Sequence, residues 1–210
     1  DPFLTGFGLA INKINLCLHF AMGSIEWTGL LARISFALNV QFVYISTVSV
    51  FSDEQIGPYH VTDIPKPDSE YGIYKRQSEL IAKKENPKAY ILRLGWQIGD
   101  DFNKNQMLNF MHKQMEEKGF IEASSKWYPS ASFLDDTAKA IGEICLHYPH
   151  DLYLINSNHS YTFYEIAKNL SLLYPEFIIK ETTDFQADHR MIDLRVPIKK
   201  FREIVWNRSE

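Results

Sequence analysis

The sequence predicts an α/β fold in which helices cover a sheet of parallel strands. Three short apolar runs, at residues 42–45, 90–94 and 152–155, have the length and composition of buried strands. Longer segments with apolar residues at helical spacing separate these runs, and parallel strands need such crossover segments to connect them. The chain is therefore predicted to be a series of strand–helix units.

The remaining elements of the first half follow from local patterns. Residues 14–21 form a further apolar run typical of a strand, and residues 27–38 repeat apolar side chains at the helical period. Glycine and prolines mark residues 48–68 as a long loop. Asp68 or Ser69 is expected to cap a helix that runs to about residue 84.

The second half continues with three more helices. Residues 103–118 are amphipathic, and their methionine stripe is interpreted as core packing rather than a cofactor site. The aspartate pair at 135–136 suits the positive end of a helix dipole and introduces a helix to about His147. Thr162 and Glu165 form the T-x-x-E pattern of a capping box, which opens the last predicted helix.

Composition restricts the class of protein. The 210 residues are 45% hydrophobic with a net charge of −4, which is typical of a globular protein and gives no reason to expect nucleic-acid or membrane-surface binding. No apolar run reaches the ~18 to 20 residues of a membrane span, and the start lacks the basic region of a signal peptide. Cys17 and Cys145 are expected to be buried thiols in a reducing compartment. We therefore expect a cytoplasmic protein.

No metal site is predicted. His147 and His150 stand three apart with Pro149 between them, and neither a cysteine nor a third histidine lies near them in the sequence to complete a ligand set. We interpret both as surface histidines.

The chemistry is concentrated around Thr47, Tyr71 and Lys75. Thr47 follows the apolar run at 42–45, so its hydroxyl is placed at the carboxyl end of a strand, where α/β folds bind ligands. Tyr71 and Lys75 are four apart, which puts them on one face of a helix. A lysine beside a phenol favours the phenolate and is expected to lower the tyrosine's pKa toward the working pH.

Together these three residues suit the transfer of a proton to or from a carbonyl or carbinol oxygen, with Thr47 bonding the same oxygen. The alternative is that Tyr71 and Lys75 are ordinary surface residues of a helix, since a lone Y-x-x-x-K arises often by chance.

The ordered set of motifs around these residues resembles the extended short-chain dehydrogenase/reductases, within them the dTDP-4-dehydrorhamnose reductase branch. That branch has a Ser-Thr pair after a strand, then P-Y-x-E-x-D, Y-G-x-x-K-x-x-x-E and R-x-x-W. The counterparts here are residues 46–53, residues 58–63, Tyr71 and Lys75 with Glu79, and Arg93 with Trp96.

The resemblance implies a Rossmann-like, doubly wound parallel sheet with a smaller C-terminal α/β lobe. Residues 1–100 would form the nucleotide-binding core, with its first units incomplete. Residues 101–210 would mainly form the substrate-binding lobe and return some elements to the core sheet. The implied activity is an NAD(P)H-dependent reduction of a nucleotide-linked 4-keto-6-deoxy sugar, by a protein that could be a homodimer.

The resemblance also assigns roles to residues. Tyr71 would be the general acid, Lys75 would lower its pKa and hold the cofactor ribose, and Thr47 would bond the substrate carbonyl. Ser46 would lie against the cofactor, which would be NADPH or NADH. Trp96 would form an apolar wall under the sugar ring, although simple core packing is an equal alternative, and Arg93 is interpreted as structural.

The front of the chain departs from the family. Gly6 and Gly8, in a Thr-Gly-x-Gly fragment, are the candidates for a phosphate-binding turn, but a plain glycine turn explains them equally well. The first strand–helix units are missing or condensed into the opening residues. A truncated chain, omitted disordered segments and a natural protein without the nucleotide half compete as explanations. We favour omitted segments, with a break at residues 21–24, because a half-sheet would expose an apolar edge.

Two other functions compete with the reductase. A nucleotide-sugar epimerase or dehydratase would use the same tyrosine and lysine, but a dehydratase usually needs a carboxylate next to the threonine, where Val48 stands. Val48 also replaces the aspartate of the reductases and leaves the identity of the substrate open. The other class is a binding or regulatory homologue that keeps the fold without catalysis, as the regulatory subunit of methionine adenosyltransferase does.

Overall fold

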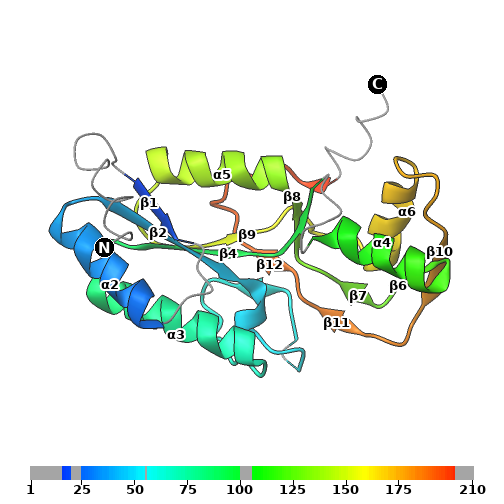
Figure 1. Cartoon of the computed structure of the whole chain (residues 1–210), viewed down its shortest axis with the longest axis horizontal. Helices are drawn as coiled ribbons and strands as arrows, with labels where there is room; N and C mark the ends of the chain where they lie inside the picture. Colours follow the sequence, from blue (N-terminus) through cyan, green and yellow to red (C-terminus); the bar gives the residue numbers. More distant parts are fainter. Residues whose placement is uncertain (1–15, 20–24, 55, 100–105, 202–210) are drawn as a thin grey trace.

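A computed structural model describes residues 16–19, 25–54, 56–99 and 106–201. Its centre is a four-stranded, fully parallel sheet with the strand order β1-β2-β4-β9 (Figure 1). The strands are β1 (Leu16–His19), β2 (Gln41–Thr47), β4 (Tyr90–Leu94) and β9 (Leu152–Ile155). The strands predicted from apolar runs are confirmed, and β2 extends to include the predicted Thr47.

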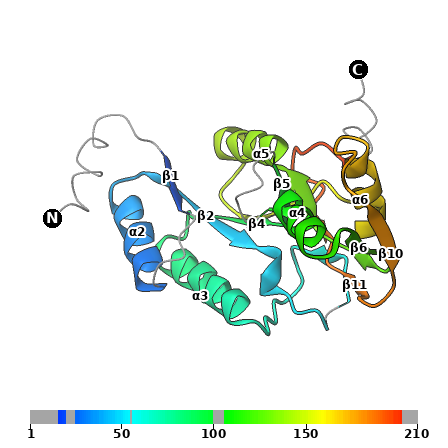
Figure 2. The same cartoon turned by 45° about the vertical axis from the view of Figure 1, so that its right-hand side comes forward.

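Helices cover both faces of this sheet. The helices α2 (Ile25–Ala37) and α3 (Glu70–Glu85) lie on one face, and α5 (Leu134–His147) lies on the other (Figures 1 and 2). Successive β2 side chains alternate between the faces: Phe42 packs in the cluster that contains α2 and α3 residues, and Val43 packs in the one that contains α5 residues. This two-sided burial explains the continuous apolar runs and confirms the predicted doubly wound α/β fold.

A smaller lobe is built from later elements. It contains α4 (Met107–Lys118), α6 (Phe163–Ser171) and two parallel strand pairs. The strand β6 (Ile121–Ser124) pairs with β10 (Ile179–Thr182), and β7 (Trp127–Tyr128) pairs with β11 (Ala187–Asp188).

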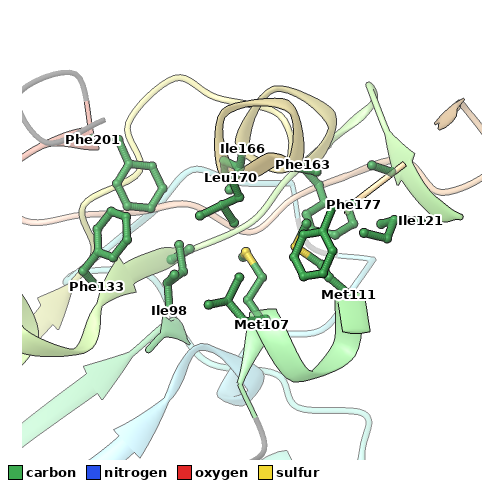
Figure 3. Packing of buried hydrophobic residues seen from close by; sticks show 14 residues of the cluster. Ile98, Met107, Met111, Ile121, Phe133, Phe163, Ile166, Leu170, Phe177 and Phe201 are labelled. Carbon is green, nitrogen blue, oxygen red and sulfur yellow. The ribbon is translucent and has the colours of Figure 1, made fainter. Parts of the chain in front are cut away.

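Figure 3 shows the core of this lobe. Met107 and Met111 of α4 lie in one buried cluster with Phe163, Ile166 and Leu170 of α6. The methionine stripe is therefore core, as predicted. The expected capping box is also present, because Thr162 accepts a bond from the backbone N–H of Glu165 and the Glu165 carboxylate accepts one from the backbone N–H of Thr162.

Short elements join the two parts. The predicted loop at 48–68 contains a 3₁₀ turn, η1 (Val48–Val50), and a short strand, β3 (Tyr59–His60), which pairs with β12 (Met191–Ile192) near the end of the described chain. The strand β5 (Trp96–Ile98) pairs with β8 (Ala131–Phe133), which runs directly into α5. The second half of the chain thus returns α5 and β9 to the central sheet, and brings β12 against the loop that follows β2.

The start of α3 is pressed against η1. Ser69 caps the helix, and its hydroxyl accepts a bond of 3.1 Å from the Gly72 N–H. A Cβ on Gly72 would lie 2.0 Å from the Ser49 carbonyl oxygen, so only glycine allows this close approach. The contact sets Tyr71, the neighbour of Gly72, beside the end of β2.

Among the residues that the structure describes, every helix is too short or too polar to span a membrane.

Candidate active site

Thr47 lies at the carboxyl edge of the central sheet. It is the last residue of β2, and its hydroxyl oxygen accepts a 3.2 Å bond from the Ser49 N–H. This bond caps the 3₁₀ turn η1 and fixes the threonine side chain. Edges of this kind are where parallel sheets place ligand-binding groups.

Tyr71 stands in the first turn of α3 and reaches Thr47. A hydrogen bond joins the two side chains and acts to lower the pKa of the phenol, but burial raises that pKa by more, so the net shift is upward. The prediction that the Tyr71 pKa is lowered is therefore wrong. The reason is that the phenol is partly removed from water, which disfavours the phenolate.

Lys75 lies one turn further along the same face of α3, and its predicted proximity to Tyr71 is confirmed. Its Nζ is 5.9 Å from the centre of the Tyr71 ring and 5.0 Å from that of Tyr44. The side chain is 3% exposed and donates a 2.8 Å bond to the Ile45 carbonyl. Burial lowers the Lys75 pKa to about 8, and the nearby Glu79 opposes this only in part.

A second buried charge cluster lies beside Lys75. Arg93 on β4 makes two bonds of 2.8 Å to the Glu79 carboxylate, and Arg76 adds a third. Burial acts to raise the Glu79 pKa, but the arginine bonds and a bond from Ser46 outweigh it and hold the pKa below its usual range. The interpretation of Arg93 as structural agrees with this geometry.

Ser46 belongs to the same cluster. Its hydroxyl donates a 2.6 Å bond to Glu79, and the residue is 3% exposed. In this structure the Ser46 hydroxyl makes a structural contact, and its contact with a cofactor stays a prediction. The cause is the alternation of β2, which turns Thr47 outward and Ser46 toward α3.

A cavity of about 430 Å³ opens next to Thr47 and Tyr71. It lies between the carboxyl edge of the central sheet and the smaller lobe, and Lys75 and Ser46 do not line it. Trp96 forms part of its wall and also packs against the lobe core, with 5.2 Å between its ring centre and that of Phe110. Both interpretations of Trp96, as cavity wall and as core, thus describe the same side chain. The lining side chains that bear on the chemistry are Thr47, Tyr71, Trp96, Trp127, Ser130 and His189.

Sequence reasoning missed Trp127, Ser130 and His189 as site residues. The Trp127 indole N–H donates a 3.1 Å bond to His189 Nδ1, and His189 Nε2 lies 3.0 Å from an Asp53 carboxylate oxygen. Burial lowers the His189 pKa more than the neighbouring aspartates raise it. No local pattern in the sequence relates these three residues to Thr47, because they are more than 70 positions from it and meet it only in the fold.

Other predictions have no geometry to judge them. Gly6, Gly8 and the proposed break at residues 21–24 lie outside the described residues.

Cys17 and Cys145 are half-buried thiols whose pKa values burial raises. Within the described ranges, no group of three or more His, Cys, Asp or Glu side chains is placed to hold a metal ion.

The parallel sheet, its helices on both faces and the cavity at its carboxyl edge define a Rossmann-like α/β protein. The model of the RmlD substrate binding domain matches residues 24–171, which is more than half of the chain. The chain belongs to this family.

Individual relatives are more distant. Spore coat polysaccharide biosynthesis protein SpsK of Bacillus subtilis (strain 168) is 27% identical over 130 residues, which are 62% of this chain and 45% of that protein. The matched stretch thus spans less than half of this curated relative.

Among solved structures, a dTDP-4-dehydrorhamnose reductase of Clostridium acetobutylicum has a TM-score of 0.76 at 17% identity, covering 96% of this chain and 80% of that one. The dTDP-4-dehydrorhamnose reductase of Bacillus anthracis, in complex with NADP, has a TM-score of 0.74 at 18% identity, covering 91% and 79%. At these identities the two structures establish a shared fold.

Proposed function

We propose that this chain carries the substrate site and proton-transfer residues of an NAD(P)H-dependent reductase that acts on a nucleotide-linked 4-keto-6-deoxy sugar. The observation that supports this most is the hydrogen bond between Thr47 and Tyr71 on the wall of the 430 Å³ cavity. Two neighbouring hydroxyls can hold one carbonyl oxygen, and the tryptophans of the wall offer apolar faces to a sugar ring. Membership of the RmlD family and the likeness to dTDP-4-dehydrorhamnose reductases support the choice of substrate.

Each residue has a defined task in this proposal. Thr47 donates its hydroxyl hydrogen to the carbonyl oxygen and holds it beside Tyr71. Tyr71 donates its phenolic proton to the same oxygen as negative charge develops there. The raised Tyr71 pKa keeps the phenol protonated before the reaction, as a general acid requires. Lys75 lies beneath the phenol, where a cationic charge stabilises the resulting phenolate.

The site also suits the nicotinamide end of a dinucleotide. The Tyr71 hydroxyl at the cavity is a donor of the kind that a ribose hydroxyl or a substrate oxygen accepts, and the buried Lys75 ammonium behind it acts through the phenol. The bound nicotinamide would supply the hydride. The complex of the Bacillus anthracis reductase with NADP supports this choice of cofactor. Gly6 and Gly8 remain the candidates for the phosphate contacts.

The decisive measurement is the oxidation of NADPH or NADH by the purified chain in the presence of dTDP-4-dehydrorhamnose, the substrate for which the similar solved reductases are named. We expect turnover in the wild type, and a loss of about 10²- to 10⁴-fold in Tyr71→Phe, since the phenolic proton is removed. Tyr164→Phe on α6 is the matched control, because that tyrosine does not line the cavity.

Three outcomes would contradict the proposal. Equal turnover in Tyr71→Phe and the wild type would remove Tyr71 from the chemistry. Binding of the sugar nucleotide without turnover would favour the regulatory homologue, whereas interconversion of sugar epimers without net cofactor oxidation would favour the epimerase.

A further inference from the structure

We propose that His189 is a positioning residue that holds Trp127 in place as a wall of the cavity while its imidazole is neutral, and releases it when the imidazole is protonated. This rests on the proposed function for the nature of the ligand, but the coupling between His189 and Trp127 does not.

The argument starts from the backbone. Trp127 is the first residue of β7, and His189 directly follows the paired strand β11. The His189 N–H donates a 2.8 Å bond to the Tyr128 carbonyl, which continues the ladder by one more residue. The strand register therefore fixes the two side chains against each other before any side-chain bond forms.

The side-chain bond then determines the tautomer of the histidine. The Trp127 indole nitrogen can only donate, so His189 Nδ1 must accept across the 3.1 Å contact and carries no proton. The proton of a neutral ring is then on Nε2, which lies 3.0 Å from the Asp53 carboxylate. His189 thus connects the loop that follows η1 with the smaller lobe, across one end of the cavity.

Protonation of the neutral His189 ring would abolish its hydrogen bond with the Trp127 indole. A second proton on His189 would sit on Nδ1 and point at the indole N–H, so two donors would face each other where one bond existed. The Trp127 ring would have to turn away. This ring also packs against Trp96 at 5.8 Å, Phe163 at 5.2 Å and Phe185 at 5.3 Å between ring centres, so its rotation would disturb the wall as a whole.

The aspartates around His189 and the burial of its ring shift the pKa of the imidazole in opposite directions. Asp53, Asp188 and Asp68 favour the imidazolium, while burial opposes it and dominates. The influence of Asp188 is reduced because Arg190 pairs with its carboxylate at 2.6 Å. Asp53 has a 66% exposed side chain, so water screens its charge. The aromatic neighbours Tyr59, Phe185 and Trp127 carry no charge in this range and leave the neutral ring favoured near pH 7.

The first test follows the Trp127 indole N–H by ¹⁵N-correlated NMR, with its signal assigned by its loss in Trp127→Phe. From about pH 8 to about pH 4.5, a range that extends to lower pH because burial lowers the His189 pKa, we expect this signal to shift as the bond to His189 is lost. In His189→Gln the shift should disappear, because the amide can still accept from the indole but does not titrate. A Trp127 signal that is insensitive to pH in the wild type, or that shifts equally in His189→Gln, would overturn the coupling.

The second test measures the affinity for dTDP-rhamnose, the product of the proposed reaction, over the same pH range by calorimetry. We expect about a three- to tenfold loss on acidification in the wild type, as for one neutral hydrogen bond, and a flat profile in His189→Gln. His189→Phe should bind weakly at every pH. Affinity that is equally pH-independent in the wild type would overturn the role in the cavity. Absence of binding at any pH would count against the proposed function, and the indole titration would still decide the coupling.

Discussion

Two buried cations lie side by side between α3 and the sheet, and their surroundings differ sharply. Arg93 is 1% exposed and meets the Glu79 carboxylate through two bonds, with Ser46 and Arg76 completing the carboxylate's contacts. Lys75 is 3% exposed and its ammonium bonds a neutral backbone carbonyl, with Glu79 only a partial electrostatic partner. Arg93 thus makes its bonds to a carboxylate, whereas the Lys75 ammonium donates to a backbone carbonyl.

Under the proposed function, the difference separates a structural cation, Arg93, from one that supports the chemistry, Lys75. The bonds from the arginines and Ser46 keep Glu79 ionised, as its lowered pKa indicates. Burial gives the Lys75 ammonium a pKa of about 8, close to the range in which proton transfer is catalysed. Lys75 and Glu79 are four residues apart on one helix, yet the fold joins Glu79 to Arg93 on β4.

The largest expected effect is on catalysis. Lys75→Met should lower the turnover of the proposed reductase by about 10²-fold or more, because the phenolate of Tyr71 loses its cation. Its free energy of unfolding should change by about 1 kcal/mol or less, since the lost bond and the relieved burial of the charge offset each other. Lys83→Met is the matched control, because Lys83 on the same helix also bonds a backbone carbonyl, that of Ala89. Equal losses of activity in the two variants would break the distinction.

The next effect is on stability. Arg93→Met should lower the free energy of unfolding by about 3 to 5 kcal/mol, because it leaves the Glu79 carboxylate buried without its main partner. Chemical denaturation measures this change. A second substitution, Glu79→Leu in the same chain, should recover much of the loss. If Arg93→Met destabilised the protein no more than Lys75→Met, the two cations would be equivalent and the comparison would fail.

The third prediction uses pH. The Lys75 pKa is lowered from 10.5 in the unfolded chain to about 8 in the fold, so the unfolded state binds more protons between these values. Burial of the charge therefore destabilises the protein fully below about pH 8, and the penalty is relieved as the pH rises. Between about pH 8 and about pH 9.5 the free energy of unfolding should gain roughly 2 kcal/mol from this group. Denaturation of Lys75→Met should lack this gain, and an identical rise in the variant would refute the assignment.

The smallest effect concerns Ser46. Ser46→Ala should reduce stability by about 1.5 kcal/mol, because Glu79 loses one of its donors and keeps the two arginines. The affinity for NADPH should stay unchanged, as followed by nicotinamide fluorescence. Weaker cofactor binding with unaltered stability would instead support the predicted contact between Ser46 and the cofactor.

Much of the fold and part of the site could be predicted from the sequence. The apolar runs determined β2, β4 and β9, because strands buried on both faces need no polar alternation. Local chemistry determined the Ser69 cap, the Thr162 capping box and the shared helix face of Tyr71 and Lys75. Each of these depends on residues within a few positions of each other.

Only the tertiary structure decided the rest. Ser46 and Thr47 are adjacent in sequence, yet one bonds Glu79 and the other lines the cavity. Trp127 and His189 are 62 positions apart and meet because β7 and β11 pair. The pKa of Tyr71 rises because of burial, which has no local signature. Spacing along a strand or helix is a short-range property, whereas desolvation and contacts between distant strands exist only once the chain has folded.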